Sequence, residues 1–109
     1  MEKDFFKYQA QTTPHPLAIE VLKAKGSYIY DQNKKKYLDF IAGVSACSLG
    51  HCHPKVVNAV KSQLDKYLHV MVYGEFIQEP AVQLTKLLNH HLPDNLTTTY
   101  LTNSGTEAI

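Results

Sequence analysis

Two segments in the second half of the chain repeat apolar residues at helical spacing, and each opens at a proline. After Pro54 the apolar side chains recur every three or four residues, at Val56, Val57, Val60, Leu64, Tyr67 and Leu68. After Pro80 the same spacing places one group of side chains on one side, Ala81, Leu84, Leu87, Leu88 and His91. Apolar residues at this spacing form one face of an amphipathic helix, and proline suits the first helical position. The pattern predicts two helices, the second of which is stopped by Pro93-Asp94-Asn95.

The first forty residues predict a short helix and then a small antiparallel β-meander. Residues 2–11 favour the helix, which a proline-broken loop at 13–16 ends. Short β-like runs follow at 19–22, 27–30 and 36–40. Between the last two runs, Asp31 is a typical turn starter, and Asn33 tolerates the left-handed backbone region.

Residues 41–53, IAGVSACSLGHCH, have neither helical nor strand periodicity and are rich in small side chains. Such a loop lets other backbone or a ligand approach closely. The β-branched and aromatic run 97–101 predicts a strand, and 102–109 predict a turn into a helix. The chain is therefore expected to be α+β, with segments 1–17, 18–53, 54–95 and 96–109 in order.

Composition excludes several classes of protein. The formal net charge is +1 and all eleven basic residues are lysines, so no basic surplus favours nucleic-acid binding. No apolar run is long enough to cross a membrane, and the first residues lack the apolar core of a secretory signal. We expect a cytoplasmic protein in which Cys47 and Cys52 are reduced, small and buried.

The cluster His51-Cys52-His53, with Cys47 nearby, invites a zinc interpretation. Structural zinc sites favour paired ligands in two separated knuckles, so this spacing argues against a metal. For His51 we expect a ring hydrogen-bonded to neighbouring backbone. His53 is explained as the residue that precedes a helix beginning at Pro54.

Other polar residues give weaker signals. Asp39 and Glu79 are isolated carboxylates in the sequence, so they do not indicate a general acid/base pair. Neither cysteine is matched to a particular base as a nucleophile. Tyr73, beside Gly74, is interpreted equally well as part of a ligand pocket or as a core tyrosine on a loop.

The segment Ser104-Gly105-Thr106-Glu107 fits a capping box, in which Ser104 caps a helix and Glu107 reaches back to the Ser104 backbone N–H. A helix entrance concentrates unpaired N–H groups and the positive end of the helix dipole. Gly105 leaves room for close approach, and the Thr106 hydroxyl adds a donor. These residues suit a phosphate, although an ordinary capping box with nothing bound explains the same spacing.

Five blocks in order resemble the opening of the class III aminotransferases, with the acetylornithine and ornithine enzymes most similar. They are Gly26-Ser27-Tyr28-Ile29-Tyr30-Asp31, Tyr37-Leu38-Asp39-Phe40-Ile41-Ala42-Gly43-Val44, Leu49-Gly50-His51-Cys52-His53-Pro54, Glu79-Pro80-Ala81 and Asn103-Ser104-Gly105-Thr106-Glu107-Ala108. The resemblance covers the chain from about Ala18 onward. It implies the N-terminal piece of a fold-type I enzyme that uses pyridoxal 5′-phosphate (PLP), ending at the first strand-to-helix turn of the large domain.

The resemblance also implies roles for residues. The family's Ser-Gly-Thr segment holds the cofactor phosphate, which corresponds here to Ser104, Gly105 and Thr106. Val44 and Ser45 correspond to a segment that approaches the substrate, and Tyr73 is a further candidate for substrate binding. The substrates implied are an amino acid, such as ornithine or acetylornithine, and a 2-oxo acid, with a homodimer or higher oligomer as the assembly.

The family's Schiff-base lysine, its acid on the pyridine nitrogen and its carboxylate-binding arginine all lie further along than these blocks, so no catalytic residue is assigned here. We therefore expect this chain alone to be inactive, as a truncated piece with weak or no PLP binding. The alternative is a non-catalytic, self-associating α+β module, since an unpaired strand at 97–101 would present an open edge.

Overall fold

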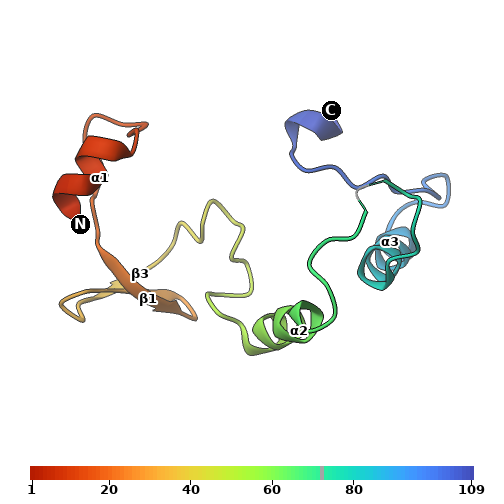
Figure 1. Cartoon of the computed structure of the whole chain (residues 1–109), viewed down its shortest axis with the longest axis horizontal. Coiled ribbons are helices and arrows are strands. Elements are labelled where there is room, and N and C mark those ends of the chain that lie inside the picture. Colours follow the sequence, from red (N-terminus) through yellow and green to blue (C-terminus); the bar gives the residue numbers. More distant parts are fainter. Residues whose placement is uncertain (72) are drawn as a thin grey trace. The chain divides into compact units, whose positions relative to one another are not determined.

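The computed structural model describes residues 1–71 and 73–109, so Val72, in the irregular stretch that follows the first predicted helix, lies outside the described residues. These residues form two compact units, 1–68 and 69–109 (Figure 1). The first unit contains α1 (Glu2–Tyr8), β1 (Val21–Lys25), β2 (Tyr28–Asp31), β3 (Lys36–Leu38) and α2 (Pro54–Leu64). The second contains α3 (Glu79–His91) and the single 3₁₀ turn η1 (Thr106–Ala108).

The three strands form the predicted antiparallel meander, in the order β1-β2-β3. Lys23, Tyr28, Tyr30 and Lys36 share one face of the sheet. Lys23 pairs with Tyr30, and its Nζ lies 5.0 Å from the centre of that ring. Lys36 also pairs with Tyr30, and its Nζ lies 3.6 Å from the centre of the Tyr28 ring. Cation–π attraction therefore adds to the ladder hydrogen bonds between neighbouring strands.

Asp31 organises the turn between β2 and β3, as its residue type predicts. Its Oδ1 accepts hydrogen bonds from the N–H groups of Asn33 and Lys35, both at 2.9 Å, and its Oδ2 accepts one from the Tyr37 hydroxyl at 2.9 Å. Burial raises the pKa of Asp31, but these hydrogen bonds outweigh it and hold the pKa below its ordinary value. The left-handed position falls on Lys34, at φ 64°, one residue beyond the expected Asn33.

Both predicted helix starts are confirmed, because α2 begins at Pro54 and α3 carries Pro80 as its second residue. The predicted extent of α2 was too long: Tyr67 and Leu68 lie beyond its end. After Leu64 the chain passes into turns, and the Gln63 side-chain amide donates to the Tyr67 carbonyl at 3.0 Å. Apolar spacing thus continues past the residue at which the helical backbone hydrogen bonds end, and helix ends are the least certain part of a prediction from spacing.

The N-terminal helix also ends earlier than predicted, at Tyr8 instead of Gln11. Gln9 adopts an extended conformation, at φ −105° and ψ 124°. The Gln11 side chain then turns back and donates to the carbonyls of Phe5, at 3.0 Å, and Gln9. A side chain that satisfies the last carbonyls of a helix replaces the next turn of backbone hydrogen bonds.

The predicted strand at 97–101 is wrong: those residues have no strand structure. The segment is instead joined to α3 through Asn89. The Asn89 amide donates to the Thr97 carbonyl at 2.5 Å, and the Thr99 hydroxyl donates to Asn89 Oδ1 at 3.2 Å. A strand exists only when a neighbour completes its ladder, and residues 73–109 contain no strand that could do so.

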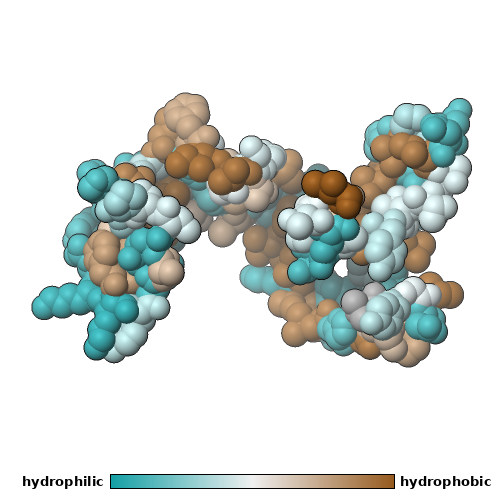
Figure 2. Space-filling model, turned by 90° about the horizontal axis from the view of Figure 1, so that it is seen from above, coloured by the Kyte–Doolittle hydropathy of each residue, from teal (hydrophilic) through white to brown (hydrophobic). Residues whose placement is uncertain are grey.

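No apolar side chain is buried among residues 1–71 and 73–109; the one residue classed as buried there is Asp31, at 9% exposure. Figure 2 shows hydrophobic residues, in brown, at the surface among hydrophilic ones. The apolar sides of α2 and α3 remain largely open, with Val60 at 53% and Leu87 at 57% exposure. Surfaces of this kind mark sites where further protein packs.

Helix length bears on membrane insertion. The described helices reach thirteen residues at most, in α3. None of them has the length and apolar character needed to cross a bilayer.

Candidate functional site

Residues 103–107 form a tight turn closed by two reciprocal hydrogen bonds. Ser104 Oγ accepts from the Glu107 N–H at 3.3 Å, and Glu107 Oε2 accepts from the Asn103 N–H at 2.9 Å. The predicted capping pattern is therefore present, with two corrections. Glu107 reaches Asn103 and not Ser104, and the helix that follows is the single 3₁₀ turn η1, with Gly105 as its cap residue.

The backbone of this turn is exposed. A Cβ built on Gly105 would meet no heavy atom within 4 Å, so the backbone is open to close approach. The N–H groups of Asn103, Glu107 and Ala108 are already bonded, so those of residues 104–106 are the donors of this turn left for a ligand. The Ser104 and Thr106 hydroxyls lie at the same exposed turn. The Glu107 carboxylate lies on the Asn103 side and is the one negative charge that a bound anion would meet there.

Residues 41–50, which we call the 41–50 loop, contain the predicted substrate residues Val44 and Ser45. Four successive residues have left-handed backbone: Ala42 at φ 50°, Gly43 at 59°, Val44 at 55° and Ser45 at 67°. Val44 is 87% exposed, so its side chain is free to meet a ligand. For a β-branched residue this conformation is a genuine outlier, and each such residue costs about 1–2 kcal/mol. The loop must therefore be held by its surroundings.

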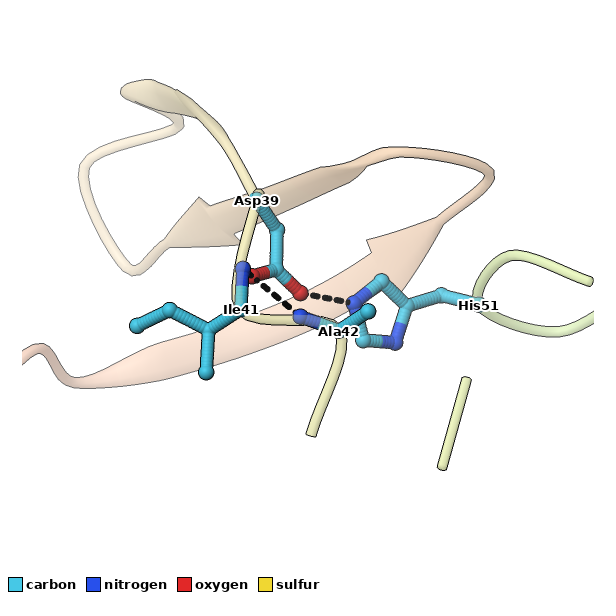
Figure 3. A network of polar contacts seen from close by, with 4 residues as sticks. All are labelled: Asp39, Ile41, Ala42 and His51. Carbon is cyan, nitrogen blue, oxygen red and sulfur yellow. Dashed lines mark hydrogen bonds and ion pairs between the residues drawn. The ribbon is translucent and has the colours of Figure 1, made fainter. Parts of the chain in front are cut away.

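Asp39 and His51 meet across the two ends of this loop (Figure 3). His51 Nε2 lies 2.6 Å from Asp39 Oδ2, with side-chain exposures of 18% and 7%. Asp39 Oδ1 accepts from the N–H groups of Ile41 at 2.9 Å and Ala42 at 3.0 Å. Two expectations are corrected: His51 bonds a carboxylate instead of backbone, and Asp39 is not isolated. The residues are twelve positions apart with no shared periodicity, so no spacing pattern in the sequence signals the contact.

Hydrogen bonds lower the pKa of Asp39. The bond from the His51 ring lowers the pKa of Asp39 most, followed by the bond from the Ala42 N–H. Burial acts in the opposite direction but does not outweigh them. An ionised carboxylate only accepts hydrogen bonds, so the His51 ring N–H is the donor.

His51 is also fixed through its backbone, to the turn between β1 and β2. Its N–H donates to the Gly26 carbonyl at 2.8 Å, and the Gly26 N–H donates to the His51 carbonyl at 2.9 Å. Gly50 permits this approach, since a Cβ there would lie 3.2 Å from Gly26 Cα. Its φ of 84° also favours glycine.

The cysteines are less enclosed than predicted. Both thiols are free, Cys47 is half-buried and Cys52 is exposed, so the expectation of two buried thiols is wrong. Both line a hollow of about 410 Å³ formed by residues 46–53 with Val56 and Val57. In the described ranges, no three His, Cys, Asp or Glu side chains are placed to hold a metal ion together.

The remaining site residue, Tyr73, is 67% exposed and belongs to the second unit, together with residues 104–106. The ring is accessible to a ligand, but this exposure does not decide between the two interpretations, because no apolar side chain of the described residues is buried. Val44 and Ser45 belong to the first unit.

Comparison with known proteins matches residues 8–109 to the family described as Aminotransferase class-III. Over 91 residues the chain is 47% identical to the acetylornithine aminotransferase of Bacillus amyloliquefaciens, covering 83% of this chain and 38% of that protein.

Two solved structures are also similar. An adenosylmethionine-8-amino-7-oxononanoate aminotransferase from Methanocaldococcus jannaschii superposes with a TM-score of 0.84 at 26% identity, over 98% of this chain and 26% of that one. An ornithine aminotransferase from Toxoplasma gondii, whose structure shows partial occupancy of PLP at its active site, superposes with a TM-score of 0.63 at 34% identity, over 83% and 22%. The chain therefore spans between about a fifth and two fifths of the relatives it matches.

Proposed function

Because the chain belongs to the class III aminotransferases, we propose that it supplies the N-terminal part of a PLP-dependent enzyme that transfers an amino group from an amino acid to a 2-oxo acid. Ornithine or acetylornithine is the proposed donor. The observation that carries this proposal is the family match over residues 8–109, joined to 47% identity with an acetylornithine aminotransferase.

The cofactor phosphate is the group that the 103–107 turn would hold. Ser104 and Thr106 offer hydroxyls, and Gly105 offers an open backbone with room for close approach. Donors already fixed in place before a ligand arrives bind a phosphate without further ordering. When bound, PLP supplies the electron sink that amino-group transfer requires. The contribution of this chain is to bind and orient the phosphate.

Val44 and Ser45 are the proposed substrate-facing residues of the first unit, and Tyr73 is that of the second. Val44 gives an exposed apolar contact, Ser45 a hydroxyl, and Tyr73 an exposed ring with a polar tip. Each is proposed to contact the amino acid substrate, since exposed apolar and polar groups of these kinds line small-molecule sites.

The chain by itself is proposed to be inactive. None of its eleven lysines lies in a block matched to the family's cofactor-binding lysine, and it contains no arginine to hold a substrate carboxylate. The turn η1 is three residues long, so its dipole is weak, and phosphate binding by the isolated chain should be weak as well.

The test compares this 109-residue chain with the longest protein in which the sequence occurs. Each is mixed with PLP, its visible spectrum is recorded, and amino-group transfer from ornithine and from acetylornithine to a 2-oxo acid is assayed. We expect a cofactor spectrum and turnover only in the longer protein. Turnover by the chain alone would contradict its proposed inactivity, and a longer protein without PLP or transfer would contradict the proposed function.

A second candidate is a non-catalytic module that associates with copies of itself. The lack of buried apolar side chains in the described residues favours it, since the open sides of α2 and α3 would then be covered in an oligomer. Sedimentation of the chain without cofactor distinguishes the two. A stable oligomer that neither binds PLP nor occurs within a longer aminotransferase supports the module.

A further inference from the structure

We propose that Asp39 and His51 are positioning residues, which hold the 41–50 loop in its left-handed conformation so that Val44 and Ser45 face outward. The pair touches neither of those residues. It acts through the loop, whose two ends it joins. The assignment of Val44 and Ser45 to substrate rests on the proposed function, whereas the joining of the loop ends does not.

The Asp39 side of the pair is held in a single orientation. Its own N–H donates to the Ser27 carbonyl at 2.9 Å, which fixes the backbone beside the sheet. Its carboxylate then uses both oxygens, Oδ1 for the N–H groups of Ile41 and Ala42 and Oδ2 for His51. A carboxylate with three donors makes charge-assisted hydrogen bonds, which are stronger than neutral ones. The first turn of the loop is therefore set by where the carboxylate points.

The backbone of His51 is held in place by the turn between β1 and β2. Its backbone pairs with Gly26 in both directions, so the ring is carried on the same sheet that carries Asp39. The ring N–H then reaches Asp39 at 2.6 Å. Without that contact, Oδ2 would lose its partner and the side chain would be held only by the two N–H bonds to Oδ1.

The loop between the two residues needs such a restraint. Backbone bonds inside the loop run from the Cys47 N–H to the Ala42 carbonyl at 2.8 Å, from Ser45 to Ile41 at 3.2 Å, from Ala46 to Gly43 at 3.4 Å and from Gly50 to Cys47 at 2.8 Å. The Ser48 hydroxyl also donates to the Ser45 carbonyl at 2.6 Å, and none of these bonds involves Val44. Ala42, Val44 and Ser45 all adopt positive φ without being glycine. Conformations of this kind persist only where surrounding contacts determine them.

The experiment is amide hydrogen exchange, followed by NMR, on the complete 109-residue chain without cofactor. His51→Ala removes the ring but keeps the backbone pairing with Gly26, and His51→Gln keeps an amide N–H near the position of Nε2. His15→Ala is the matched control, a histidine of the same unit outside the loop. We expect His51→Ala to speed exchange at Ile41 and Ala42 at least about tenfold, although neither amide bonds His51. His51→Gln should restore most of the protection, and His15→Ala should change nothing.

A second readout separates positioning from general loss of structure. The amides of Asn33 and Lys35 are held by Asp31 in the same sheet, and their protection should stay the same in His51→Ala. The backbone carbon shifts of Val44 should move away from left-handed values in that variant and return in His51→Gln.

Three results would overturn the proposal. The first is unprotected Ile41 and Ala42 amides in the unmodified chain, and the second is equal protection in His51→Ala. The third is simultaneous loss of protection at Asn33 and Lys35. Failure of the chain to bind PLP would count against the proposed function alone, since no cofactor enters this experiment.

Discussion

A Cβ on Gly50 would lie 3.2 Å from both the Cα and the carbonyl oxygen of Gly26. Two glycines 24 positions apart thus allow the loop end to lie against the β1–β2 turn. Gly50 is constrained twice, by this contact with backbone and by its φ of 84°, whereas Gly26, at φ 57°, has nothing within 4 Å of a built Cβ.

Gly50→Ala should therefore disrupt the pairing of Gly26 with His51 more than Gly26→Ala does. Alanine at a left-handed position costs about 1–2 kcal/mol in either variant, and only at Gly50 does contact with backbone add to it. Hydrogen exchange at the Gly26 and His51 amides measures the difference. Equal protection in the two variants would contradict the close approach.

The lowered pKa of Asp39 makes the stability of the fold depend on pH. The pKa of Asp39 is lowered in the folded chain, chiefly by the hydrogen bond from His51. This carboxyl therefore stabilises the fold at pH values above its ordinary pKa of 3.8, and the contribution is lost as the pH falls through the folded pKa. The Asp39 carboxyl carbon, followed by NMR, should titrate with a midpoint below 3.8. In His51→Ala the midpoint should rise. A midpoint that His51→Ala leaves in place would show that the ring does not act on Asp39.

Asp31 provides an independent test of how a hydrogen bond from a side chain lowers the pKa of a carboxyl. The Tyr37 hydroxyl donates to Asp31 Oδ2 at 2.9 Å, so Tyr37→Phe should raise the pKa of Asp31 while the bonds from Asn33 and Lys35 remain. Tyr30→Phe, in the same sheet, is the control and should leave the Asp31 titration unchanged. An equal shift in both variants would assign the effect to the sheet as a whole.

Asn89→Ala should release residues 97–99 from α3. Asn89 accepts from the Thr99 hydroxyl and donates to the Thr97 carbonyl, and alanine removes both bonds. Amide ¹⁵N relaxation should then show larger picosecond-to-nanosecond motion at Thr97 and Thr99. Asn58→Ala, on α2, is the matched control. Unchanged relaxation in Asn89→Ala would mean that this segment is held by other contacts.

The sequence predicted the features that depend on neighbouring residues. Alternating β-formers around the Asp31 turn predicted the meander, and Pro54 and Pro80 marked where two helices begin. Both signals arise within a few residues, so they are visible without the fold. The resemblance to a family, carried by five ordered blocks, is confirmed by the match over residues 8–109.

Features that depend on distant residues were missed. The contact of Asp39 with His51 exists only because the sheet brings the two ends of a loop together, and no periodicity relates positions twelve apart. The strand predicted at 97–101 had the right composition, but strand structure also requires a neighbour. Near the helix ends at Tyr8 and Leu64, glutamine side chains bond backbone carbonyls, which propensity does not anticipate.

The central claim is that Ser104, Gly105 and Thr106 hold the phosphate of PLP in an aminotransferase. The most direct measurement is the PLP dissociation constant of the longest protein that contains this sequence, beside its Ser104→Ala/Thr106→Val variant and a Thr98→Val control. The double variant should bind PLP at least about tenfold more weakly, since hydrogen bonds to a charged group are lost, and the control should match the unmodified protein. Unchanged PLP affinity in the double variant would contradict the claim.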